Sequence, residues 1–147
     1  RLRIEHQWLR PEDGSAPLLV FLHEGLGSVA MWSSRSMDWP LAICHATGRA
    51  GLLYSRLGYG KSDTIPDVRG AHRLGPDYMH REAWEVLPEL LAALRIEQPV
   101  LLGHSDGGTI ALLHAARHAL SACGHSPHRE QAALSTQLIT AFLAPLA

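Results

Sequence analysis

The chain has 147 residues, of which 46% are hydrophobic and 18% charged, and its formal net charge is −1. This length predicts one soluble domain over residues 1–147 with a sizeable core. The balanced charge argues against a nucleic-acid partner or a membrane surface, and no apolar run approaches the roughly 20 residues of a membrane span. With two cysteines and no signal segment, we expect a cytoplasmic location and no disulfide framework.

Four segments have the pattern of β-strands. The first alternates apolar and polar residues, as a half-buried strand does. The second, LLVFLHE, is a continuous apolar run that is typical of a strand covered on both faces. In chain order the predicted strands lie at 1–9, 18–24, 50–55 and 98–105.

Helices are expected between these strands. Asp38 can cap the N-terminus of a helix that has Pro40 in its first turn and Gly48 after its end. Helical spacing of apolar residues predicts further helices over 79–94, over 107–118 and at the C-terminal end. The alternation predicts an α/β fold with a truncated, doubly wound, mostly parallel sheet of four to five strands flanked by helices.

Ser105 lies at a predicted strand-to-helix turn, in the G-x-S-x-G sequence GHSDG. A tight turn of this kind exposes the serine hydroxyl and leaves little room for a Cβ two residues away, which explains Gly103 and Gly107. The N-terminus of the following helix favours developing negative charge. We therefore expect Ser105 to be a nucleophile and the N–H of Asp106 to be one donor of an oxyanion hole.

The glycine-rich HEGLGS sequence follows the second predicted strand, where a second oxyanion donor is expected. Gly25 is the preferred donor and Leu26 the alternative. The sequence lacks the second histidine of the H-E-x-x-H zinc motif. His114 and His118 are four residues apart on one predicted helix, but no third ligand follows them at a suitable spacing. We expect neither a metal nor another cofactor.

Five blocks, in this order, resemble the alpha/beta-hydrolase fold superfamily, and especially its bacterial esterase-like members: HEGLGS, YSRLGYGKSD, DYMHREAWEVLPELL, VLLGHSDGG and CGHSPHREQ. The resemblance implies that Ser105 is the nucleophile, that Gly25 and Asp106 line the oxyanion hole, and that His125 is the catalytic base. It also implies that His128 is not catalytic.

The sequence departs from this family after residue 118. Family members place two further strands, a helical lid and the strand bearing the triad acid between the equivalents of ALLHAARH and CGHSPHREQ, where this chain has only ALSA. The chain thus resembles a minimal or internally deleted hydrolase without a lid. The triad acid is unassigned; possible substitutes are Glu24, Asp63, Asp106 and Glu130.

Two routes can bring His125 toward Ser105. A helix over 106–117 descends about 18 Å at ~1.5 Å per residue, and five extended residues, 119–123, can climb back about 17 Å as a short fifth strand. If the helix instead continues, the two residues lie about 30 Å apart, and a second subunit must supply His125 through a swapped C-terminal helix. Because the truncated sheet exposes the edge of strand 99–102, we expect a homo-oligomer formed through that edge or that helix.

The expected function is hydrolysis of short-chain acyl esters through an acyl-enzyme on Ser105, with acyl transfer to alcohols as a variant. Trp32, Trp39 and Trp84 are candidates for an acyl pocket, although large apolar residues are more often core. The alternative is a catalytically weak or inactive hydrolase-fold module that binds or assembles with other molecules.

Overall fold

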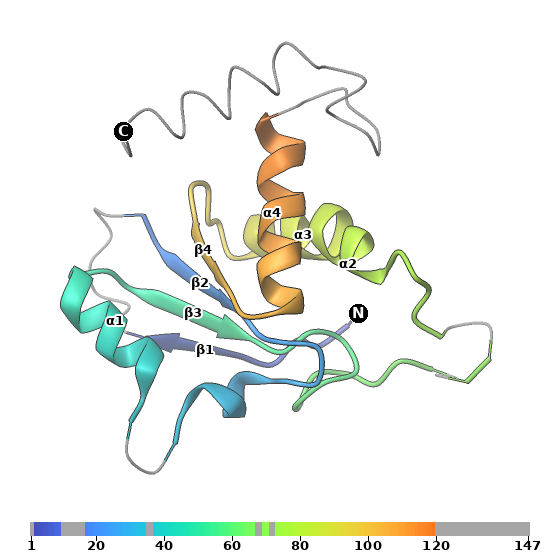
Figure 1. Cartoon of the computed structure of the whole chain (residues 1–147), viewed down its shortest axis with the longest axis horizontal. Coiled ribbons are helices and arrows are strands. Elements are labelled where there is room, and N and C mark those ends of the chain that lie inside the picture. Colours follow the sequence, from blue (N-terminus) through green and yellow to red (C-terminus); the bar gives the residue numbers. More distant parts are fainter. Residues whose placement is uncertain (1, 10–16, 35–36, 67–68, 71–72, 120–147) are drawn as a thin grey trace.

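The computed structural model describes residues 2–9, 17–34, 37–66, 69–70 and 73–119, with side chains described through residue 117. It contains one four-stranded sheet in the order β1-β3-β2-β4 (Figure 1). β1 pairs antiparallel with β3, whereas β2 pairs in parallel with both β3 and β4. The strands are β1 (His6–Leu9), β2 (Leu19–Leu22), β3 (Gly51–Tyr54) and β4 (Val100–Gly103). The predicted α/β fold with a mostly parallel, truncated sheet is confirmed.

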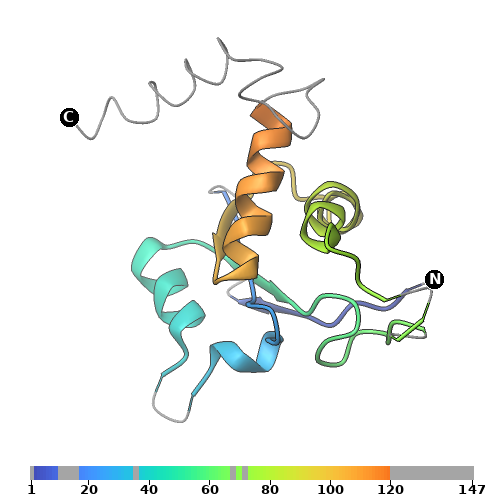
Figure 2. The same cartoon turned by 45° about the vertical axis from the view of Figure 1, so that its right-hand side comes forward.

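Helices cover both faces of this sheet. α1 lies on one side and the helices that follow β3 lie on the other (Figure 2). Phe21 and Leu53 face the α1 side, whereas Val20 and Leu52 face the second side, so each central strand contributes to both cores. The helical segments are η1 (Val29–Trp32), α1 (Trp39–Thr47), α2 (Tyr78–Arg81), η2 (Glu82–Val86), α3 (Leu87–Ala93) and α4 (Asp106–Ala119).

The ends of α1 are set by local sequence. The Asp38 side chain accepts a hydrogen bond of 3.0 Å from the N–H of Leu41, and Pro40 occupies the first turn, where its missing N–H costs nothing. Gly48 ends the helix in the left-handed conformation, with φ of 66°. The predicted helix and both of its end residues are confirmed.

The segment predicted as one helix over 79–94 is interrupted by a π-helical turn, η2. Pro88 has no N–H to donate to the carbonyl of Trp84, the bond that a continuous α-helix would require. That carbonyl instead accepts a 2.6 Å hydrogen bond from the Arg117 guanidinium of α4. Within the same turn, buried Glu82 accepts a 2.9 Å hydrogen bond from the Tyr54 hydroxyl of β3. The irregular turn therefore fastens this helical segment to both the sheet and α4.

β4 is, with β1, one of the two edge strands of the sheet in the described part of the chain. Its residues are only partly covered, and Val100 is 40% exposed. Ala119, predicted as the first residue of a fifth strand over 119–123, is instead the last residue of α4. The rest of that segment lies outside the described residues, as do His125, Glu130 and the expected C-terminal helix. Both routes for His125 therefore stay predictions.

Candidate active site

Ser105 lies in the turn between β4 and α4, and its backbone has φ of 53°. Residues with a Cβ rarely adopt this left-handed conformation, and such strain is concentrated at functional sites. The turn is held by hydrogen bonds from the N–H of Gly107 to the His104 carbonyl and from the N–H of Gly108 to the Ser105 carbonyl, of 3.0 and 2.9 Å. The Ser105 side chain is exposed.

The glycines on either side of Ser105 allow this turn to pack closely. A Cβ at Gly103 would collide with the main chain of Gly107, and a Cβ at Gly107 would collide with the carbonyl of Leu22 in β2. By contrast, a Cβ at Gly108 would lie 3.4 Å from its nearest neighbour, which is ordinary contact. The turn thus approaches both its own helix and the neighbouring strand at main-chain distance.

The HEGLG loop, residues 23–27, follows β2 and lies against the start of α4. A Cβ at Gly25 would lie 2.8 Å from Oδ2 of Asp106. The N–H of Leu26 donates a 3.1 Å hydrogen bond to the Glu24 carboxylate. In contrast, the N–H groups of Gly25 and Asp106 donate to no acceptor within the described ranges. Two uncommitted donors therefore lie on adjacent segments beside Ser105.

The Asp106 side chain is held by a neighbouring helix. The Tyr78 hydroxyl, at the start of α2, donates a hydrogen bond to Oδ2 of Asp106. Partial burial and this negatively charged partner raise the pKa of Tyr78 to about 12. Tyr78 therefore stays protonated at neutral pH, and the Asp106 carboxylate is committed to it.

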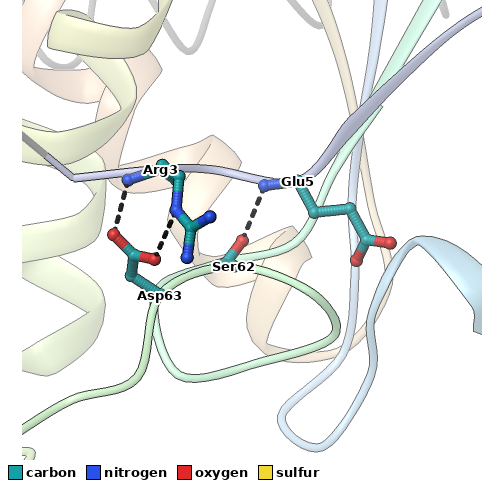
Figure 3. A network of polar contacts seen from close by, with 4 residues as sticks. All are labelled: Arg3, Glu5, Ser62 and Asp63. Atoms are coloured by element: carbon teal, nitrogen blue, oxygen red, sulfur yellow. Dashed lines mark hydrogen bonds and ion pairs between the residues drawn. The ribbon is translucent and has the colours of Figure 1, made fainter.

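The described candidates for a triad acid all have other partners. Besides the Asp106–Tyr78 contact, the Glu24 carboxylate accepts the hydrogen bond from Leu26. Asp63 pairs with Arg3, whose N–H and guanidinium donate hydrogen bonds of 2.8 and 3.0 Å (Figure 3). The main-chain hydrogen bond from Arg3 is the main cause that lowers the pKa of Asp63. The fourth candidate, Glu130, lies outside the described residues.

The Arg3–Asp63 pair is part of a clamp between the N-terminal segment and the loop after β3. The N–H of Glu5 donates 2.9 Å to the Ser62 hydroxyl (Figure 3). The N–H of Asp63 donates 2.9 Å to the Arg3 carbonyl. The Glu5 carboxylate accepts a 2.6 Å hydrogen bond from the Ser55 hydroxyl, which lowers the pKa of Glu5. Because Ser55 also accepts from the N–H of Val29, the clamp reaches the segment after the HEGLG loop.

Two of the three candidate pocket tryptophans lie near Ser105. Trp32 and Trp39 stack on each other at 5.9 Å between ring centroids, and Trp32 meets the ring of His104 at 6.5 Å. Trp84 instead belongs to η2 and faces α4, where its indole N–H donates 3.1 Å to the Leu113 carbonyl. Trp32 and Trp39 are therefore placed as one apolar wall beside the turn.

The sequence profile of the alpha/beta hydrolase fold family matches residues 17–134, which is most of the chain. The chain belongs to the alpha/beta hydrolase fold family. Within the described residues, no group of three histidine, cysteine or acidic side chains could hold a metal ion. No helix in those same ranges is long and apolar enough to cross a membrane.

Solved structures of this family resemble the chain over only part of their own length. An alpha/beta hydrolase fold protein from Burkholderia ambifaria shares 27% identity, with a TM-score of 0.53, over 85% of this chain and 38% of that one. The enol-lactonase from Burkholderia xenovorans LB400 shares 24% identity, with a TM-score of 0.62, over 80% and 40%. A structure from work on carboxylesterases of Nitrososphaera gargenis shares 21%, with a TM-score of 0.61, over 80% and 38%. No curated protein matches the chain.

The fold brings together Ser105, Asp106, Gly25 and Leu26, the described site residues that the sequence singled out. It also places there two residues that no sequence motif indicated: Tyr78 lies beside Asp106, and Arg56 lies beneath the HEGLG loop. The position of Arg56 in the sequence could have indicated its place near the site. Arg56 follows a strand of a parallel sheet, so it belongs to the same carboxyl edge as the HEGLG and Ser105 turns.

Proposed function

We propose that this chain is a serine hydrolase that cleaves short-chain carboxylic esters, with Ser105 as the nucleophile. The observation that carries the proposal is the left-handed backbone of Ser105, with φ of 53°, which holds an exposed hydroxyl at the strand-to-helix turn. Membership of the alpha/beta hydrolase fold family supports it. So do structural relatives described as an enol-lactonase and as carboxylesterases, since both act on acyl–oxygen bonds.

In the proposed reaction, His125 accepts the proton of the Ser105 hydroxyl while Oγ attacks the ester carbonyl carbon. The N–H groups of Gly25 and Asp106 stabilise the resulting oxyanion. Collapse of the tetrahedral intermediate breaks the bond to the alcohol, which leaves with the proton from His125, and water then hydrolyses the acyl-enzyme. An alcohol that replaces this water would take up the acyl group. The uncommitted N–H groups beside the turn support this assignment.

A small acyl group is the preferred substrate in this proposal. Ser105 is exposed, and the Trp32–Trp39 wall offers apolar contact on one side. An open site of this kind buries little of a long chain, so extra methylene groups gain little affinity. We also propose that turnover is slow, because a base histidine that lacks an orienting carboxylate can lose about 10⁴ in rate.

We further propose that a second copy of the chain covers the open side of β4. A hollow of about 760 Å³ lies between α3, β4 and α4 and is lined mainly by apolar side chains, including Leu91, Leu101 and Leu112. Leu112 and Val100 are 74% and 40% exposed. Contact between copies would bury this surface, and a swapped C-terminal segment would bring His125 to the Ser105 of its partner.

The decisive experiment measures hydrolysis of a chromogenic butyrate ester, together with labelling by a fluorophosphonate probe. Ser105→Ala should abolish both, whereas Thr109→Ala, an exposed position one turn along α4, should retain both. Full activity in Ser105→Ala would refute the nucleophile. If the wild-type chain neither hydrolyses the ester nor reacts with the probe, the non-catalytic alternative is correct. Activity restored by mixing Ser105→Ala with His125→Ala would show that the two residues come from different copies.

A further inference from the structure

Arg56 is a buried arginine that donates hydrogen bonds to main-chain carbonyls. The residue is 4% exposed, and its guanidinium stands 5.1 Å from the ring centroid of Tyr59. One Nη donates to the carbonyl of His23 at 2.8 Å, and the other donates to those of Glu24 at 2.9 Å and Gly25 at 3.4 Å. The ion pairs found among the described residues involve Arg3 and Arg81 instead. The whole fork is thus directed at three successive peptides of the HEGLG loop.

The main chain of Arg56 holds the same loop through an imidazole. Its N–H donates 3.0 Å to Nε2 of His23, so this nitrogen is an acceptor and the ring proton is on Nδ1. Nδ1 in turn donates 2.7 Å to the Glu24 carbonyl. That carbonyl therefore accepts from the Arg56 guanidinium, from His23 and from the N–H of Gly27 at 3.1 Å. Three donors on one oxygen fix the plane of the Glu24–Gly25 peptide.

The orientation of this peptide decides where the N–H of Gly25 points. The C=O of Glu24 and the N–H of Gly25 belong to one planar trans peptide, so they point in opposite directions. Donors gathered on the oxygen therefore turn the N–H away from Arg56. On its other side, Gly25 packs against Asp106, the residue after Ser105. Because glycine has no Cβ, little else would prevent this peptide from flipping.

We propose that Arg56 is a positioning residue that keeps the Gly25 N–H directed at the oxygen of the reacting carbonyl. This inference rests on the proposed function. Arg56 would not touch the substrate; it would act by holding one oxyanion donor in place before the reaction begins. Its loss should therefore weaken binding of the tetrahedral intermediate more than binding of the ester, which lowers kcat with little change in KM.

The test compares Arg56→Lys with the matched control Arg49→Lys. Lysine keeps the charge but lacks the planar fork that spans several carbonyls. Arg49 also donates a hydrogen bond to a main-chain carbonyl, that of Pro17 at 2.9 Å. Arg49 precedes β3, however, whereas Arg56 follows it. For a butyrate ester, Arg56→Lys should lower kcat by about tenfold or more and leave KM within about twofold of wild type. It should also lower the affinity for an alkylboronic acid, which mimics the tetrahedral state, by a similar factor. Arg49→Lys should stay within about twofold of wild type in every value.

An Arg56→Lys protein that is folded and keeps both kcat and boronate affinity would overturn the proposal. A second measurement does not depend on activity. In amide NMR spectra, Arg56→Lys should displace the Gly25 resonance, whereas Arg49→Lys should leave it in place. If Arg56→Lys fails to fold, boronate added to the wild-type protein should displace the Gly25 amide and leave Leu26 in place; an unmoved Gly25 signal in the adduct overturns the proposal. Failure of the proposed function is distinct, since the wild-type protein would then neither turn over the ester nor bind the boronate.

Discussion

The main-chain N–H of Arg56 donates a 3.0 Å hydrogen bond to Nε2 of His23, and this contact fixes the ring in its neutral form. Protonation would place a hydrogen on Nε2, facing another N–H. Burial, and next the positive charge of Arg56, lower the pKa of His23. His23, which works with Arg56 to hold the Glu24 carbonyl, is thus a histidine that resists protonation.

This relationship predicts how stability depends on pH. An unfolded histidine has a pKa of about 6.5, and the folded value is lower. As pH falls through about 6.5 toward the folded pKa, His23 becomes protonated in the unfolded chain but stays neutral in the folded chain. The free energy of unfolding therefore decreases. His23→Gln, which keeps an acceptor but does not titrate, should show a smaller decrease in urea unfolding between about pH 8 and pH 5. His45→Gln, at an exposed position of α1, should retain the wild-type slope, and equal slopes for His23→Gln would contradict the explanation.

Glu82 should contribute a pH dependence of the opposite sign. It is 7% exposed and accepts the Tyr54 hydrogen bond, and its burial raises its pKa. As pH rises from about 4.3, the unfolded glutamate ionises first, so this group lowers the free energy of unfolding until the folded pKa is passed. Glu82→Gln keeps an oxygen for Tyr54 and should remove this loss, which makes the variant relatively more stable at pH 8 than at pH 4. Glu85→Gln, an exposed neighbour in η2, serves as the control; a Glu82→Gln curve parallel to wild type would count against the assignment.

Gly107 and Gly108 are adjacent glycines for which alanine should have opposite effects. At Gly107 the new methyl group would collide with the main chain of β2, which cannot move without breaking the sheet. We expect Gly107→Ala to lose about 3 kcal/mol or more in the free energy of unfolding, because backbone overpacking has no flexible side chain to absorb it. Gly108→Ala should be neutral or more stable by up to about 1 kcal/mol, since alanine favours the helix. Thermal and urea unfolding would measure both, and similar losses would contradict the steric argument.

Val100 offers a test of the proposed contact between copies. Light scattering of the wild-type chain at micromolar concentration should give a mass of at least about two chains. Lysine on an edge strand opposes pairing, so Val100→Lys should shift the protein toward the monomer. Leu74→Lys, at a 49% exposed position in the loop before α2, should leave the mass unchanged. A wild-type chain that stays monomeric would disprove the association.

Much of the fold could be predicted because its signals are local. Asp38 and Gly48 delimit α1 through contacts within a turn of their own positions. Gly103, Ser105 and Gly107 predicted a tight strand-to-helix turn in the same way. The π-helical turn at Glu82 was missed although Pro88, within the predicted helix, is a local signal for an interruption. The side chains that complete its hydrogen bonds, Tyr54 in β3 and Arg117 in α4, lie far away in the sequence.

The contacts that shape the candidate site were harder to predict, since they depend on strand order. β2 lies between β3 and β4, so the loop after β3 delivers Arg56 under the HEGLG loop. Nothing in the residues near His23 specifies that its ring will meet Arg56. Likewise, Tyr78 begins a helix far from Asp106 in the chain, and only the packing of α2 beside α4 joins them.

The position of β2 also sets an order for synthesis of the chain. Leu19 pairs on one side with Gly51, which is made soon after it, and on the other with Val100, which is made much later. Until β4 leaves the ribosome, the apolar run of β2 has one unpaired edge in a nascent chain. Such an edge can pair with other strands. A chaperone that shields β2 during this interval should therefore raise the yield of folded protein more than one added after synthesis is complete.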